Sequence, residues 1–170
     1  MRFRKYAIKT RIDNLRERII DLTLTKPQST ESYATLIHLN CVSQLASFFA
    51  MNYSLDLELA AAAGLLHDID VLVNGYNADH ASHSSIMARG MLVSLGSFSE
   101  NDIDTIVSSV ARHSDKSKVD DIYDEILKDA DTLAYYLQKP YDNVNNEGFR
   151  KKRLKRIFKA FGWKNLYSEP

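Results

Sequence analysis

The chain has 170 residues, 45% of them apolar and 26% charged, which is ordinary for one globular domain and argues against a disordered chain. A formal net charge of zero argues against a dedicated nucleic-acid binder, and a single cysteine, Cys41, excludes a disulfide framework. The basic N-terminus lacks the pattern of a secretory signal, and we find no apolar stretch of about 20 residues, so we expect a cytoplasmic protein without a membrane span.

Helical periodicity dominates the chain. Apolar residues recur at steps of three and four, no segment alternates as a strand would, and the fold class we predict is all-α. Pro27 and Pro140 are predicted to stop helices, Gly96 to cap one, and Ser99 with Asp102 to start another. The predicted helices span residues 5–24, 30–51, 56–67, 79–95, 99–113 and 120–137, with one more after the polar loop YDNVNNEG.

The charges are unevenly placed. Residues 150–159 hold seven cations and no acid, whereas residues 100–131 are rich in Asp and Glu. The last helix also has an apolar face, made of Leu154, Ile157, Phe158 and Phe161. We therefore interpret the basic run as the solvated face of a structural helix that attracts the acidic segment of its own domain. The alternative is a surface for nucleic acid or another anion, which we do not expect.

All five histidines lie between positions 38 and 113, at His38, His67, His80, His83 and His113, and Asp129 and Asp131 follow. Imidazole together with carboxylate suits divalent metals, and in an all-helical domain the ligands come from separate helices. His38 interrupts an apolar stripe, Asp68 follows the apolar run AAAAGLLH, and Asp131 lies in an apolar stretch. One shared cation would explain three buried polar positions that are otherwise costly.

The order His38, His67-Asp68, Asp131 resembles the HD-domain superfamily of metal-dependent phosphohydrolases, close to its small stand-alone hydrolases. AAAAGLLHDID is similar to that family's "AALLHDIG", and DHASHSS to its "DHA..SA". IVSSVARHS and ILKDADTL are similar to "I..aI..HS" and "ilqDADrL". The resemblance covers residues 30–138 and implies a single compact HD domain over residues 1–170. Residues 1–27 and the basic helix in 141–170 would pack on that bundle, with the metal site between helices.

The resemblance also implies roles. The metal ligands would be His38, His67, Asp68 and Asp131. His80 and His113 would hold a second metal or lie near the substrate phosphate. For His83 we favour a position on the helix surface over metal ligation. For Asp129 we favour a supporting or capping role over that of a ligand.

Two departures affect the expected chemistry. Asp70 stands where the family usually has glycine, and is expected to be either an acid/base group or a loop cap. The segment Leu39–Val42 lacks the arginine that often follows the first histidine, which leaves the substrate preference open.

The function implied is hydrolysis of a phosphate ester of a nucleotide or another small molecule by a metal-activated water. Asp68, His80, His113 and Asp70 are the candidate catalytic residues. The metal would be Mn, Fe, Co, Zn, Ni or Mg, with one ion favoured over two. Arg89, Arg112 and Lys116 are the nearest cations in sequence that could contact phosphate. A di-iron oxygenase and a non-catalytic sensor or binding protein remain alternatives, and homo-oligomerisation is left open.

Overall fold

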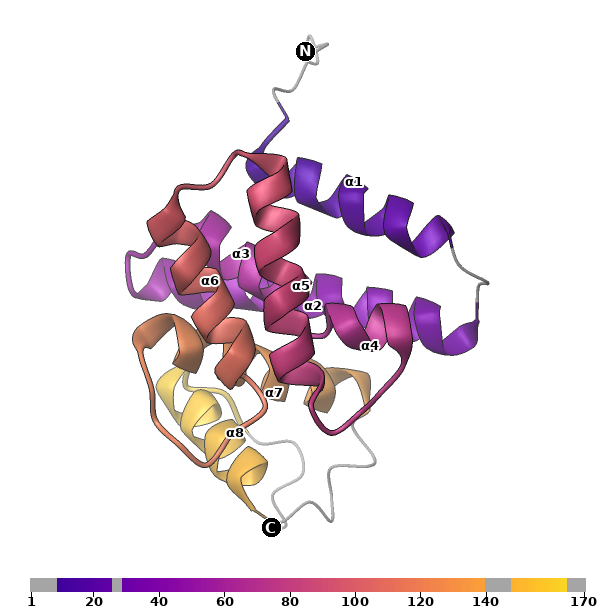
Figure 1. The fold of residues 1–170 in the computed structure, drawn as a ribbon. Coiled ribbons are helices and arrows are strands. Elements are labelled where there is room, and N and C mark those ends of the chain that lie inside the picture. The colour runs from indigo at the N-terminus through magenta and orange to yellow at the C-terminus, as the bar shows by residue number, and fades with distance from the viewer. Residues whose placement is uncertain (1–8, 26–28, 140–147, 165–170) are drawn as a thin grey trace, which may run out of the picture.

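The computed structural model describes residues 9–25, 29–139 and 148–164. Within these ranges the chain forms α-helices and no strand, as the sequence predicted (Figure 1). The helices are α1 Arg11–Leu24, α2 Thr30–Asn52, α3 Leu57–Leu66, α4 Ile69–Asn74, α5 His80–Leu95, α6 Glu100–Arg112, α7 Ile122–Gln138 and α8 Phe149–Ala160.

Most helix boundaries lie within two residues of their predicted positions. Ser99 and Asp102 form the predicted capping box of α6, and Gly96 ends α5 in the left-handed conformation with φ 63°. The first helix was predicted too long: it begins at Arg11, because Thr10 caps it in a box with Asp13. Residues 1–8 and the predicted stops at Pro27 and Pro140 lie outside the described residues.

The prediction missed α4. The backbone of Asp68 leaves the helical region (φ −118°, ψ 31°), and the chain then turns one and a half times before Gly75 ends the helix with φ 82°. A six-residue helix is too short to show a periodicity, and the Asn74-Gly75 turn signal marked only its end. The break between α3 and α4 is important because the His67-Asp68 pair lies in it.

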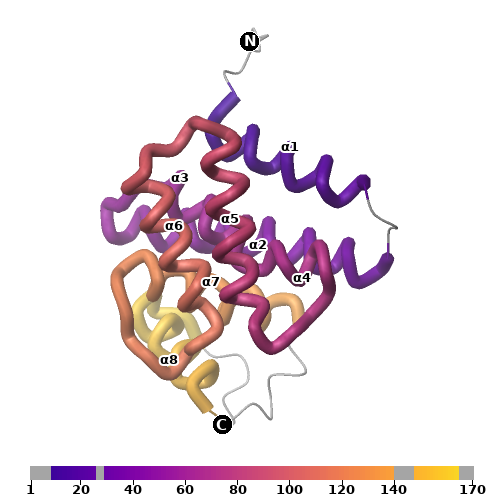
Figure 2. Tube along the Cα trace, in the orientation of Figure 1, coloured from indigo at the N-terminus to yellow at the C-terminus, as the bar shows by residue number. Residues whose placement is uncertain are grey.

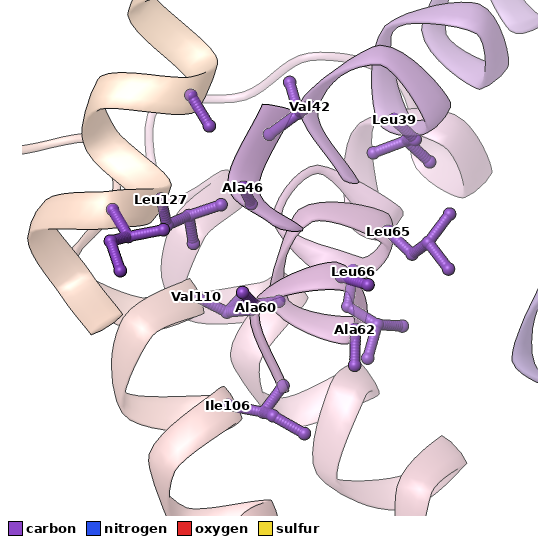
Figure 3. Close-up of a cluster of buried hydrophobic side chains, with 14 of the residues drawn as sticks. Leu39, Val42, Ala46, Ala60, Ala62, Leu65, Leu66, Ile106, Val110 and Leu127 are labelled. Carbon is purple, nitrogen blue, oxygen red and sulfur yellow. The ribbon is translucent and has the colours of Figure 1, made fainter. Parts of the chain in front are cut away.

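Helix α3 lies at the centre of the bundle and contacts α1, α2, α5, α6 and α7. Its residues Leu59 to Leu66 are all buried, and its small side chains allow close neighbours. At Gly64 an added Cβ would lie 2.5 Å from the Cα of Ser43, so the backbones of α2 and α3 touch there. Figure 3 shows α2 residues Val42 and Ala46 close to α3, with Leu127 of α7 beside them.

By length and composition α2 is the one helix in the described part of the chain that could cross a membrane, which the sequence analysis did not anticipate. The core helix of a bundle meets the same criterion. Here α2 packs along α3 and α7 (Figure 2). Its residues Leu39, Val42, Ala46 and Phe49 lie in the core. We therefore assign one face of α2 to the core of the helical bundle, although only 33% of its apolar window is buried.

Helix α8 is attached to the bundle by a buried arginine as well as by apolar packing. Ile157 and Phe158 are buried, and Arg153, only 5% exposed, donates hydrogen bonds to Glu125 and Asp129 of α7. The same guanidinium donates to the carbonyl oxygens of Lys116 and Lys118 in the α6–α7 loop. The basic helix thus pairs with the acidic segment and also fixes the loop that carries Lys116.

Candidate metal centre

The candidate site lies where six helices, α2 to α7, meet. His38 comes from the middle of α2, and His67 and Asp68 from the break between α3 and α4. His80 is the first residue of α5, and His113 caps the end of α6. Asp131 adds a carboxylate from α7. All six are buried or mostly buried, so the bundle brings together the four predicted ligands and the two additional histidines.

Three of these histidines are oriented in the same way. The Nδ1 atoms of His67, His80 and His113 lie 2.9, 2.9 and 2.7 Å from the backbone carbonyl oxygens of Gly64, Asn77 and Val110, each three residues earlier. A carbonyl only accepts hydrogen bonds, so each Nδ1 must carry the proton and donate it. In the neutral imidazole each Nε2 then keeps a free lone pair, the state in which imidazole binds metal.

The three Nε2 atoms converge on Asp68. His67 Nε2 is 3.4 Å from Oδ2, while His113 Nε2 and His80 Nε2 are 3.3 and 3.6 Å from Oδ1. The rings of His67 and His113 are 4.9 Å apart between centroids, and those of His80 and His113 are 5.3 Å apart. Lone pairs from three helices thus surround one carboxylate.

His38 and Asp131 complete the site on the side of His67. His38 Nε2 is 3.2 Å from Asp131 Oδ1, which is also 4.0 Å from His67 Nε2. The other nitrogen of His38 is 3.1 Å from Gln138 Oε1. Gln138 lies seven residues after Asp131, two turns along the same face of α7. The helical period could therefore have identified Gln138, which the sequence analysis missed.

Two sets of ligand atoms lie within 4.8 Å of one another: His38, His67 and Asp68 form one, and Asp68, His80 and His113 form the other. Asp68 belongs to both. In a site without an ion, His67 Nε2 and Asp68 Oδ1 are buried and lack a hydrogen-bond partner. Such unpaired buried polar atoms are costly, and a shared cation would satisfy both. The residues present therefore fit a divalent metal.

The electrostatics of the site also favour a cation. Burial opposes a high pKa at His67, but the carboxylates of Asp68 and Asp131 raise it overall. Burial also opposes ionisation of both carboxyls, yet hydrogen bonds and charges from neighbouring side chains hold their pKa values below the usual range. His67 and His113 lower the pKa of Asp68. Lys116, His38 and His67 lower the pKa of Asp131. Both carboxylates are therefore ionised at neutral pH and available as ligands.

Two cationic side chains flank Asp131. Lys116 Nζ donates to Asp131 Oδ2 at 2.6 Å, and Arg150 Nη2 is 3.9 Å from the same oxygen. Of the three cations that the sequence suggested for phosphate contact, the two arginines form ion pairs away from this site. Arg89 pairs with Glu100 and Asp104, and Arg112 with Asp124 and Asp121. Arg150 was missed because its place at the site depends on how α8 docks, which no local pattern shows.

Asp70 lies outside this cluster, although it was one of the candidate catalytic residues. Its Oδ1 accepts a hydrogen bond from Asn74 at 2.8 Å and its Oδ2 one from Asn77 at 2.6 Å. His83 Nδ1 is 3.5 Å from Oδ2, and the His83 side chain is 53% exposed. These contacts attach α4 to the segment before α5, so of the two expected roles the geometry supports the loop cap. Asp129 pairs with Arg153 and Arg156.

The comparisons agree with this fold. The model of the HD domain family matches residues 35–136, which include every candidate ligand but neither Gln138 nor α8. The crystal structure of a predicted HD superfamily hydrolase from an uncultured Thermotogales bacterium is similar, with a TM-score of 0.60 and 23% identity over 86% of this chain and 87% of that chain. At this identity the likeness shows a shared fold. Comparison with curated proteins gives no match.

Proposed function

Because the chain belongs to the HD domain family, we propose that it is a metal-dependent phosphohydrolase that cleaves a phosphate ester of a nucleotide or another small molecule. The observation that carries this proposal is the convergence of four imidazole Nε2 atoms on two ionised carboxylates, with His67 Nε2 and Asp68 Oδ1 buried and unpaired. Imidazole-rich donor sets of this kind favour a transition metal.

His38, His67, Asp68 and Asp131 would hold one divalent ion, and Asp68, His80 and His113 could hold a second. An ion in this site would lower the pKa of a bound water toward neutrality and polarise a phosphoryl oxygen. The protein supplies the orientation: each carbonyl behind a histidine fixes the tautomer that aims Nε2 inward.

His80 is the best placed of the histidines to exchange a proton with a leaving oxygen if a single ion is bound. Its side chain is 12% exposed, compared with 3% for His113 and none for His67, so it is the nearest to solvent of the three histidines around Asp68; His38, 17% exposed, would be a ligand of the first ion. A positioned histidine of this kind accelerates proton transfer by about 10²–10⁴-fold. Asp70 has no part in this scheme, because its oxygens are hydrogen-bonded within the loop.

The test is a screen for phosphate release. The purified protein is freed of metal, reloaded separately with Mn, Fe, Co, Ni, Zn or Mg, and assayed against nucleotides and small phosphate esters. We expect turnover with at least one ion, none in the metal-free protein, and none in Asp68→Ala. Absence of phosphate release with every ion and every ester would refute the proposal.

A di-iron oxygenase is the second candidate, and the shared position of Asp68 favours it. A carboxylate common to two three-residue sets is what a pair of ions requires. An iron-loaded protein that has a visible absorption band and consumes O2, without releasing phosphate, would replace the hydrolase proposal with this one.

A further inference from the structure

Arg150 lies at the edge of the candidate metal centre, in the first turn of α8. Its Nη2 is 3.9 Å from Asp131 Oδ2, and its Cζ lies 4.8 Å from the centroid of the Tyr135 ring. Its side chain is 43% exposed. The guanidinium thus lies between a candidate ligand and solvent, and it lies over an aromatic face.

Most other cations of the region already have close carboxylate partners. Lys116, 6% exposed, is hydrogen-bonded to Asp131, and Arg153 and Arg156 are bound to Glu125 and Asp129. For Arg150 the described residues provide only the 3.9 Å ion pair with Asp131 and the ring contact with Tyr135. Its N–H donors are therefore available to an incoming ligand.

The position of Arg150 is fixed by the docking of α8. Arg153, three residues further along the helix, donates from Nε to the carbonyl oxygen of Lys116 at 3.1 Å. This bond joins the first turns of α8 to the loop whose lysine contacts Asp131. A cavity of about 150 Å³ opens beside this junction, and among the described residues four cations and no acid line it: Lys116, Lys152, Arg153 and Arg156. Arg150 itself does not line this cavity, so the case for an anion at Arg150 rests on its own half-exposed guanidinium, whose carboxylate contact among the described residues is the one with Asp131 at 3.9 Å.

We infer that Arg150 binds the phosphate group of the substrate at the mouth of the metal centre. The inference rests on the proposed function, because it takes the substrate to be a phosphate ester. Guanidinium presents paired N–H donors that match phosphate oxygens, and a side chain already in contact with an aromatic ring loses less entropy on binding. Arg150 lies outside the matched residues 35–136, so this contact would be a feature that α8 adds to the domain.

The experiment measures binding of inorganic phosphate to the metal-loaded protein by calorimetry, in the wild type, Arg150→Ala, Arg150→Lys and Lys151→Ala. Lys151 is exposed, adjacent on α8 and of the same charge, so Lys151→Ala controls for the general loss of one positive charge. We expect Arg150→Ala to weaken phosphate binding about 10- to 100-fold, the range for a charged hydrogen bond, and Lys151→Ala to weaken it less than about threefold. Arg150→Lys should recover part of the affinity, and metal content should be equal in all four proteins.

An unchanged phosphate affinity in Arg150→Ala, equal weakening by Lys151→Ala, or a wild type that does not bind phosphate would each overturn the inference. Loss of metal from Arg150→Ala and from Arg150→Lys would overturn it too, since Arg150 would then support the ion. The proposed function is decided separately by phosphate release. A protein that binds phosphate through Arg150 but hydrolyses no ester retains this site and loses that function.

Discussion

Asp68 connects the two halves of the candidate centre, because its oxygens face His67 on one side and His80 and His113 on the other. It leaves the helical conformation between α3 and α4, so its carboxylate is not confined to the face of either helix. The sequence indicated that this residue needed a buried partner. The structure places its carboxylate in both ligand sets, the position of a bridge between two ions.

We expect Asp68→Ala to abolish retention of metal, because both sets lose their shared donor. The matched variant is Asp70→Ala, which removes a carboxylate two residues away that contacts Asn74, Asn77 and His83 and none of the candidate ligands. It should retain metal, although its melting temperature should fall as the loop loses these bonds. Elemental analysis of both purified variants measures their metal content and so tests the assignment of Asp68 as a ligand. A normal metal content in Asp68→Ala would contradict the ligand assignment.

His113 tests the number of ions. Its Nδ1 is fixed by Val110 and its buried Nε2 faces Asp68, and burial lowers its pKa, so it is a neutral imidazole ready to bind a metal. This geometry leads us to expect two ions, whereas the resemblance favoured one. His113→Ala should therefore halve the bound metal and remove activity.

The control for that experiment is His83→Ala, which changes an exposed histidine outside both sets and should alter neither quantity. Unchanged metal in His113→Ala with a turnover about 10²–10⁴-fold lower would instead show one ion and an acid/base role for His113. Halved metal would also give the di-iron alternative equal standing with hydrolysis.

The helices show where sequence patterns were sufficient and where they were not. The long amphipathic helices and the caps of α5 and α6 follow local rules, and their boundaries were predicted closely. The six-residue α4 has too few turns for a period to be visible, and the start of α1 depends on a cap at Thr10 that the prediction overlooked. Among the site residues, those within the HD phrases were named in advance. Gln138 was missed although the helical period of α7 places it on the face of Asp131, and Arg150 was missed because its role depends on how α8 packs.

The crossing of α2 and α3 sets the distance between His38 and His67, whose rings are 5.1 Å apart. Gly64→Ala would place a Cβ 2.5 Å from the Cα of Ser43, and backbone atoms can give way only if the helices separate. Overpacking of this kind costs about 1–3 kcal/mol, or several degrees of melting temperature in a domain of this size. We expect that loss together with weaker metal binding.

Gly90→Ala is the matched control for that crossing. Gly90 lies within α5, and an added Cβ there would meet nothing within 4 Å. Alanine is the better helix former by about 1 kcal/mol, so this variant should be at least as stable as the wild type. Comparing thermal melts of the two variants isolates the effect of the close approach. Equal melting temperatures would show that α2 and α3 can separate without penalty.

Across the whole molecule, α8 connects the surface of the bundle to the candidate centre. Arg153 holds the Lys116 carbonyl, and Lys116 holds Asp131, so the packing of the last helix reaches a ligand. The sequence analysis predicted this helix to be structural, from its apolar face and its attraction to the acidic segment. The path from α8 to Asp131 depends on a side chain that crosses between two helices and a loop, which composition and spacing do not reveal.

Arg153→Met should destabilise the fold, because it leaves Glu125 and Asp129 without their buried partner. Removing one member of a buried ion pair costs about 3–5 kcal/mol, and the remaining bonds of Glu125 to Lys128 and Arg156 favour the lower end of that range. Metal affinity should fall as well, since Lys116 loses its support. The control is Lys155→Met, an exposed position on the same helix, for which we expect a wild-type melting temperature.

The stability that Arg153 contributes should depend on pH. Burial raises the pKa of the Glu125 carboxyl, but its bonds to Arg153 outweigh burial and lower the pKa from 4.5 to about 2. A carboxyl with a lowered pKa in the folded state stabilises fully above its unfolded value, and the contribution disappears as the pH falls toward the folded value. The gap in melting temperature between wild type and Arg153→Met should therefore be largest at pH 7 and should shrink between about pH 4.5 and pH 2. A gap of constant size from pH 7 to pH 3 would mean that Arg153 acts through its carbonyl bonds in the α6–α7 loop and not through Glu125.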